Sequence, residues 1–163
     1  MREIVVNTGP IIALVAATQS IEWLPTLYDR ILIPREVLLE IEAGGIGNPE
    51  IIALHGVKDL VTIVQQKADL PPTLLRELDL GEASVIHAAI HHGVSTVAID
   101  EKAGRRIARL NGLKVTGSLG ILIKAKKHGL IDNLTDCISR IQFQGIWISE
   151  SLVRQALAEV GES

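Results

Sequence analysis

The sequence is poor in several residue types that mark particular classes of protein. Its 163 residues include a single cysteine, Cys137, which excludes an intrachain disulfide and any zinc or iron-sulfur site built from several cysteines. A chain with a single cysteine fits the reducing cytoplasm best. Aromatic residues number two Trp, one Tyr and one Phe, so aliphatic side chains must fill the core. A nucleic-acid partner would therefore not be held mainly by aromatic stacking.

Long apolar runs and an excess of positive charge are also missing. The N-terminal stretch IVVNTGPIIALVAA is broken by Asn7 and Pro10, lacks a basic leader, and is shorter than the roughly 20 apolar residues of a membrane span. We expect it in the core of the protein, and we expect no membrane partner. The formal net charge is −3, so nucleic-acid binding would require a local basic face. The length and the 47% hydrophobic fraction fit one domain over residues 1–163.

Short β-branched runs alternate with helical patterns along most of the chain. The runs predict strands over residues 4–6, 30–33, 60–64, 95–100 and 113–116. After the last strand the chain is expected to be helical, over residues 119–128, 134–142 and 152–160, with the final helix inside 148–163. This order is typical of a three-layer α/β fold with a mostly parallel sheet of about five strands and helices on both faces. Ligands of such sheets bind at the C-terminal edge of the strands.

The stretch from Leu80 to Arg106 brings two acids to that edge. Glu82 opens a helical pattern that Gly93 ends, and the following strand finishes at Asp100. In a right-handed crossover the helix runs antiparallel to the strands, so Glu82 and Asp100 are expected to meet. Asn7 ends the first strand at the same edge, and Glu101 is adjacent to Asp100.

Oxygen side chains gathered in this way are suited to a hard divalent cation. Asn7, Glu82 and Asp100 predict a Mg²⁺ or Mn²⁺ site that assists attack of water on a phosphodiester. Each residue also has a simpler explanation: an acid is favoured at a helix N-terminus by about 0.3–1 kcal/mol, and Asp and Asn cap helices and form turns. Hydroxyl groups at this edge can orient water or phosphate, or serve only in caps and turns. They belong to Thr8, Thr116 and Ser118.

Three further patterns carry weaker signals. The helix after Asp100 presents basic residues at helical spacing, which predicts a nucleic-acid contact or only a solvated face; they are Lys102, Arg105, Arg106 and Arg109. A second basic group is the alternative location for an RNA strand and consists of Lys124, Lys126 and Lys127. His87 and His91 lie one helical turn apart but lack an evident third ligand, so a solvated or half-buried pair is favoured. The run Gly44–Gly47 lacks the spacing of a phosphate-binding loop.

The order of these motifs resembles the PIN domain, a metal-dependent ribonuclease fold. The opening IVVNTGPIIAL is similar to the PIN strand that ends in an acid followed by Ser or Thr, which places Asn7 at the first acidic position. Pro34–Glu40 is similar to the segment P-x-x-V-x-x-E, which places Glu40 at the second. Glu82-Ala83, then Gly93 and Asp100, resemble the remainder of the pattern. The likeness extends to Trp147 and the last helix, and is closest to a poorly characterised PIN subfamily.

The resemblance implies an endoribonuclease with Asn7, Glu40, Glu82 and Asp100 as its catalytic positions. Many such proteins are the toxin half of a toxin-antitoxin pair, so it also implies RNA as substrate, a small antitoxin protein as partner, and a homodimer in the cytoplasm. Asn7 departs from the pattern, which prefers Asp, and removes one negative charge from the site. The alternative is a catalytically degenerate PIN protein that binds nucleic acid or another protein.

Overall fold

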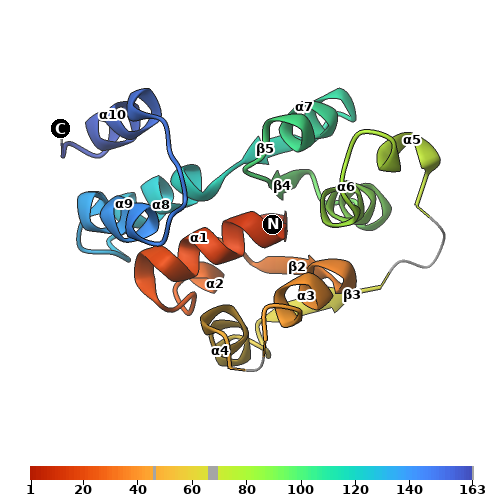
Figure 1. Ribbon diagram of the computed structural model, residues 1–163, viewed down its shortest axis with the longest axis horizontal. Helices are drawn as coiled ribbons and strands as arrows, with labels where there is room; N and C mark the ends of the chain where they lie inside the picture. Colours follow the sequence, from red (N-terminus) through yellow and green to blue (C-terminus); the bar gives the residue numbers. More distant parts are fainter. Residues whose placement is uncertain (46, 66–69, 163) are drawn as a thin grey trace.

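The structure, a computed structural model, describes residues 1–45, 47–65 and 70–162 (Figure 1). Within these ranges the chain forms a five-stranded sheet in which every pairing is parallel, with the order β3-β2-β1-β4-β5. The strands are β1 (Glu3–Val6), β2 (Arg30–Pro34), β3 (Val61–Val64), β4 (Thr96–Ala98) and β5 (Lys114–Thr116). The prediction of a parallel α/β sheet of about five strands is confirmed.

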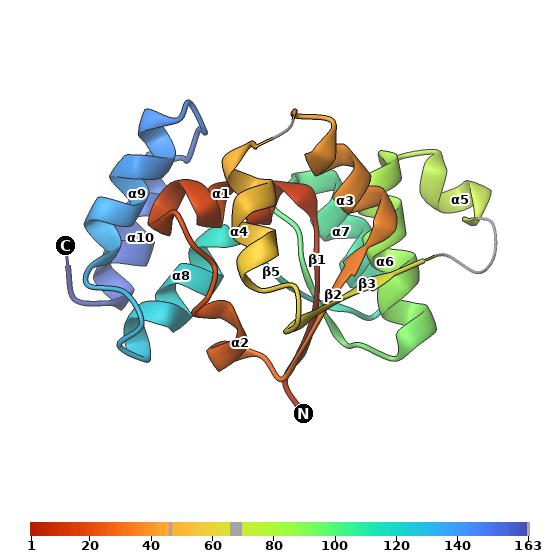
Figure 2. The ribbon, with the colours of Figure 1, turned by 90° about the horizontal axis from the view of Figure 1, so that it is seen from below.

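Helices cover both faces of this sheet (Figure 2). They are α1 (Thr8–Thr18), α2 (Leu24–Leu27), α3 (Arg35–Glu42), α4 (Pro49–Gly56), α5 (Pro72–Leu75), α6 (Leu80–His92), α7 (Lys102–Leu110), α8 (Ser118–Lys127), α9 (Leu134–Phe143) and α10 (Glu150–Glu159). α1 lies on one face with α4, α8 and α9, and α6 and α7 lie on the other. α3 contacts both α1 and α6, so it links the helices of the two faces. Among the described residues, no helix has both the length and the apolar character to cross a membrane.

The strand register brings the ends of β1 and β4 together. Val6 of β1 pairs with Ala98 of β4, and the Asn7 N–H donates to the Ala98 carbonyl at 3.1 Å. Ile99 then donates to the Thr116 carbonyl at 3.0 Å, which links β4 to the end of β5. Because parallel strands finish at a common edge, the residues that follow β1, β4 and β5 share one end of the sheet.

A continuous aliphatic core holds this edge in place. The strand residues Val5, Leu32 and Val97 are fully buried, as are helix residues such as Leu14 and Ile86. Each such side chain gains roughly 1.5–3 kcal/mol from leaving water. The small number of aromatic residues is therefore no obstacle to a dense core.

Several boundaries differ from the sequence prediction. The helical pattern expected to open at Glu82 begins two residues earlier, because α6 starts at Leu80 after the extended N-cap residue Asp79. β4 ends at Ala98, two residues before Asp100. The final helix spans Glu150–Glu159, where Ser149 caps it by accepting the Leu152 N–H at 3.2 Å. Ile46 of the glycine-rich loop and Ser163 of the predicted C-terminal segment lie outside the described residues.

Candidate metal centre

The N-terminus of α6 holds two acids side by side. Asp79 is the N-cap residue, and its carboxylate accepts the Glu82 N–H at 2.8 Å. The Glu82 carboxylate in turn accepts the Asp79 N–H at 3.4 Å through Oε1. This reciprocal capping box satisfies two helix N–H groups that have no partner within the helix. It also fixes the position of both carboxylates.

Glu101 completes a cluster of three acids with this pair. One carboxylate oxygen from each of Asp79, Glu82 and Glu101 lies within 4.8 Å of the others. Asp79 and Glu101 are exposed, whereas Glu82 is only 3% exposed. Its Oε2 atom is buried and has no hydrogen-bond partner among the described residues. A buried carboxylate oxygen left without a partner is costly, so this atom points to a ligand that the protein itself does not supply.

The electrostatics of the cluster disfavour a negative charge on Glu82. Burial raises the pKa of its carboxyl to about 7, and the side chain and charge of Asp79 and the charge of Glu101 act in the same direction, whereas the hydrogen bond from the Asp79 N–H opposes them. Repulsion between neighbouring carboxylates and loss of hydration both penalise the ionised form. A cation held between the three carboxylates removes that penalty.

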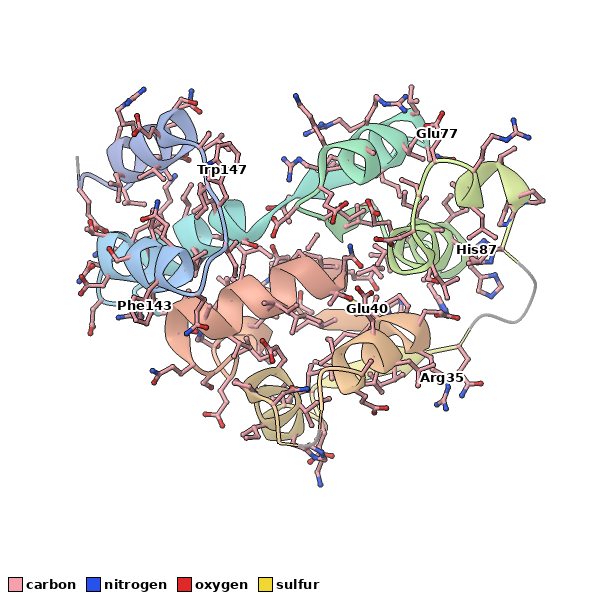
Figure 3. The ribbon with its side chains drawn as sticks, in the orientation of Figure 1. Arg35, Glu40, Glu77, His87, Phe143 and Trp147 are labelled. Carbon is pink, nitrogen blue, oxygen red and sulfur yellow. The ribbon has the colours of Figure 1, made fainter. Side chains whose placement is uncertain are left out.

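A second group of oxygen atoms converges on Gly81. A Cβ atom placed on Gly81 would lie 3.0 Å from Glu40 Oε2, 3.2 Å from Asn7 Oδ1 and 3.5 Å from Asp79 Oδ1. Glu40 is held in this direction by the Thr8 hydroxyl, which donates to Oε2 at 2.9 Å. Figure 3 shows Glu40 pointing from α3 toward the N-terminal end of α1 and α6. Asn7 is 7% exposed, and its buried Oδ1 lacks a hydrogen-bond partner within the described part of the chain.

Asp100 is bound from the other side by Ser118 at the start of α8. The Ser118 N–H donates to Oδ1 at 2.7 Å, and the Ser118 hydroxyl donates to Oδ2. A carboxylate has about four lone-pair positions, so these two bonds orient Asp100 and leave acceptor capacity for a cation. Asp100 and Glu82 lie at the same edge of the sheet. The three acids whose oxygen atoms lie within 4.8 Å of one another include Glu101 and not Asp100.

The family of PIN domains matches residues 3–162, which is nearly the whole chain. The chain belongs to the PIN-domain family. Members of this family are in general nucleases that act on nucleic acid with the help of divalent metal ions. The resemblance seen in the sequence is thereby confirmed. No curated protein matches the sequence.

The basic helix of this PIN domain differs from its predicted form. Arg105 is half-buried and donates to the Ile99 carbonyl at 2.9 Å, so it does not lie on the open side of α7. Arg106 forms a 2.6 Å ion pair with Glu77, and Arg109 is exposed. Burial lowers the pKa of Arg105, and the charge of Arg109 adds to this effect while Asp100 opposes it. Arg105 approaches the same point beside Gly117 as the Asp100 carboxylate.

The lysines of α8 are engaged with other parts of the protein. Lys124 lies 4.7 Å from the centroid of the Tyr28 ring. Lys126 donates to the Asp132 carbonyl at 2.6 Å, and Lys127 pairs with Glu159 at 3.0 Å. The lysines of α8 are therefore less available to other partners than the exposed Arg109 of α7.

Asp79 is the residue of this PIN domain that sequence reasoning missed. The signal was present, because Asp79-x-x-Glu82 is a capping-box pattern and marks the true start of α6. Thr116, in contrast, donates to the neighbouring Gly117 carbonyl at 3.4 Å and serves the turn. The rings of His87 and His91 stack with their centroids 6.2 Å apart. Among the described residues, Asp79, Glu82 and Glu101 form the one group of three or more His, Cys, Asp or Glu side chains close enough together to hold a metal ion.

The donor set of the PIN domain fits Mg²⁺ or Mn²⁺. Every candidate ligand is a carboxylate or amide oxygen, which is the preference of hard divalent cations. Two of these atoms, Glu82 Oε2 and Asn7 Oδ1, are buried without a hydrogen-bond partner among the residues described. Nitrogen and sulfur ligands, which a zinc site prefers, are absent from the described cluster.

Proposed function

We propose that this PIN domain is a divalent-metal-dependent endoribonuclease that hydrolyses RNA phosphodiester bonds. The observation that carries the proposal is the buried, unpartnered Oε2 of Glu82 inside a group of three acids. A purely structural capping acid needs only one oxygen, and Oε1 already performs that role. The remaining oxygen is buried, has no hydrogen-bond partner among the described residues and belongs to a carboxylate of the three-acid cluster, which favours metal binding.

The proposed ligands centre on Glu82. The three-acid cluster favours Asp79 and Glu101 as its neighbours around a metal ion, and the family pattern favours Asn7 and Asp100. Bound Mg²⁺ or Mn²⁺ supplies a water of lowered pKa and offsets negative charge on the phosphate.

The other polar residues have roles that follow from their contacts. Glu40, oriented by Thr8, is the proposed acceptor of the proton from the attacking water. Ser118 holds Asp100 in a fixed orientation. Arg105, beside Asp100, retains guanidinium donors for a phosphate oxygen after its bond to Ile99. Arg109 extends this positive surface along α7.

The toxin role, a small antitoxin partner and a homodimer form part of the same proposal. Exposed apolar side chains, among them Ile12 and Ile52, supply surface that a second chain can cover. Light scattering over a wide concentration range tests the dimer. A monomer mass throughout that range would contradict it.

Asn7 supports a second candidate function, a PIN protein that binds RNA without cleaving it. An amide lowers the charge of the site relative to the Asp of the family pattern, and with it the expected metal affinity. Incubation of the purified protein with mixed RNA, with and without Mn²⁺, separates the two. We expect Mn²⁺-dependent fragments that disappear in Glu82→Gln, and RNA that is retained but uncleaved by the wild type would favour the second candidate.

A further inference from the structure

A groove begins at the Asp100 side of the candidate metal centre and leads away from it. Its volume is about 640 Å³, within the range of roughly 300–1,000 Å³ found for small-ligand sites. Asp100 and Arg105 line one end, and the start of α8 forms a wall. The opposite wall consists of Trp147, Ile148 and one side of α10.

Trp147 is held with its ring exposed to solvent. It lies in the segment between α9 and α10, in which its neighbours Ile146 and Ile148 are half-buried and pack on the core while Trp147 itself is exposed. The segment is fixed at one end by the Ile146 N–H, which donates to Ile141, and at the other by the Ser149 cap of α10. The Trp147 residue is 83% exposed. Figure 3 shows it beside the end of α10 that faces α7.

The other exposed or half-buried aromatic side chains, Phe143 and Trp23, occupy different surroundings, and Tyr28 is buried. Phe143 is 88% exposed but lines a separate groove with Ile12 and Arg140. Trp23 is half-buried, and its indole N–H donates to Thr18 and to the Ser20 carbonyl at 3.0 Å. Trp147 thus differs from both in facing the groove that contains Asp100.

We propose that Trp147 stacks on an unpaired base of single-stranded RNA whose backbone passes Arg105 on its way to the metal centre. This inference rests on the proposed nuclease function and adds Trp147 as a residue that holds the substrate. Every base has a π-face, so stacking of this kind tolerates many sequences. Bases in a duplex are already stacked on one another and are not available to the indole. Arg105 is the one cation among the residues that line the groove, which also include the acids Asp100 and Glu159, so it is the group there that can hold a phosphate.

The test measures binding of a fluorescent eight-uridine oligonucleotide in EDTA, so that cleavage does not interfere. Stacking on an aromatic side chain accounts for a roughly 5- to 150-fold change in affinity. We expect a loss of that size in Trp147→Ala and recovery in Trp147→Phe. Phe143→Ala, at an even more exposed aromatic outside the groove, is the matched control and should bind as the wild type does.

An abasic oligonucleotide of the same length separates stacking from phosphate binding. It should bind equally to the wild type and to Trp147→Ala. Wild-type affinity in Trp147→Ala, an equal loss with the abasic chain, or no RNA binding at all would overturn the inference. Cleavage with Trp147-independent binding would contradict only this inference. Base-dependent binding through Trp147 in a protein that never cleaves would contradict only the proposed nuclease function.

Discussion

Gly104 of α7 lies directly against the carboxylate of Glu82 in α6. A Cβ atom on Gly104 would stand 2.5 Å from Glu82 Oε2 and 2.8 Å from a methyl carbon of Ile99. Distances this short require a neighbour to move. The absence of a side chain at position 104 is therefore a condition for the present position of the buried Glu82 oxygen.

Gly104→Ala should displace Glu82 and weaken the metal site while the protein remains folded. In a helix this substitution ordinarily stabilises by about 1 kcal/mol, so a weaker metal response would come from the contact with Glu82. The measurement is the Mn²⁺-dependent rise in melting temperature, which should shrink in the variant. Gly9→Ala is the control, because its added methyl would lie 3.8 Å from Asp100 Oδ2, an ordinary contact. A full Mn²⁺ response in Gly104→Ala would contradict this account of Glu82.

The metal-free protein should lose stability as the pH rises toward neutrality. The pKa of Glu82 is raised from 4.5 to about 7 in the folded state, so folding favours its protonated form. The stabilising contribution is fully present below pH 4.5 and is lost as the pH rises through 7. Its size is on the order of 3 kcal/mol. Denaturant unfolding in EDTA from pH 4.5 to 8 measures it, and Glu82→Gln should flatten the profile; an identical profile in that variant would contradict the assignment.

Asn7→Asp should have opposite effects with and without metal. The new carboxylate would stand near Glu40 and Asp79, so repulsion should lower the melting temperature in EDTA. With Mn²⁺ present the added charge should strengthen binding and speed cleavage or lower its metal requirement. Melting curves and initial cleavage rates measure both effects. A folded variant with unchanged rate and metal requirement would remove position 7 from the metal's ligands.

The arginines of α7 should contribute unequally to RNA binding. Arg109 is exposed, whereas Arg106 is already paired with Glu77 at 2.6 Å. Removing one cation that binds a phosphate of a single strand flattens the log-log salt dependence of affinity by roughly 0.7. RNA titrations across a salt series should show this flattening in Arg109→Ala and less of it in Arg106→Ala. Unaltered affinity and slope in the triple variant of Arg105, Arg106 and Arg109 would move the RNA path to another face.

Much of the architecture follows from local patterns in the sequence. Buried β-branched runs identified the strands, and Gly93 marked the end of α6, where it adopts a left-handed conformation with φ 67°. The crossover rule predicted that Asn7, Glu82 and Asp100 share one edge, because a crossover helix runs antiparallel to parallel strands and begins at the edge where those strands end. Thr8 and Ser118 were expected at that edge, and they contact Glu40 and Asp100.

The arrangement of side chains within the edge did not follow from those patterns. Asp100 and Glu101 are consecutive, and which of them turns toward Glu82 depends on the backbone after Ala98, where the strand has already ended. Asp79 was missed because the apolar periodicity places the start of the helix at Glu82, after the true N-cap. The exposure of Trp147 depends on Ile146 and Ile148 packing inward, a tertiary contact that a short aliphatic run does not specify.

The measurement that tests the central claim most directly is the melting temperature of the wild type and Glu82→Gln across a Mn²⁺ titration. An ion that binds only the native state stabilises it by RT ln(1 + [L]/Kd), about 2.7 kcal/mol at a hundredfold excess over Kd. We predict a rise for the wild type, a smaller rise for Asp100→Asn and none for Glu82→Gln. Equal rises in the wild type and Glu82→Gln would contradict a metal centre built on Glu82.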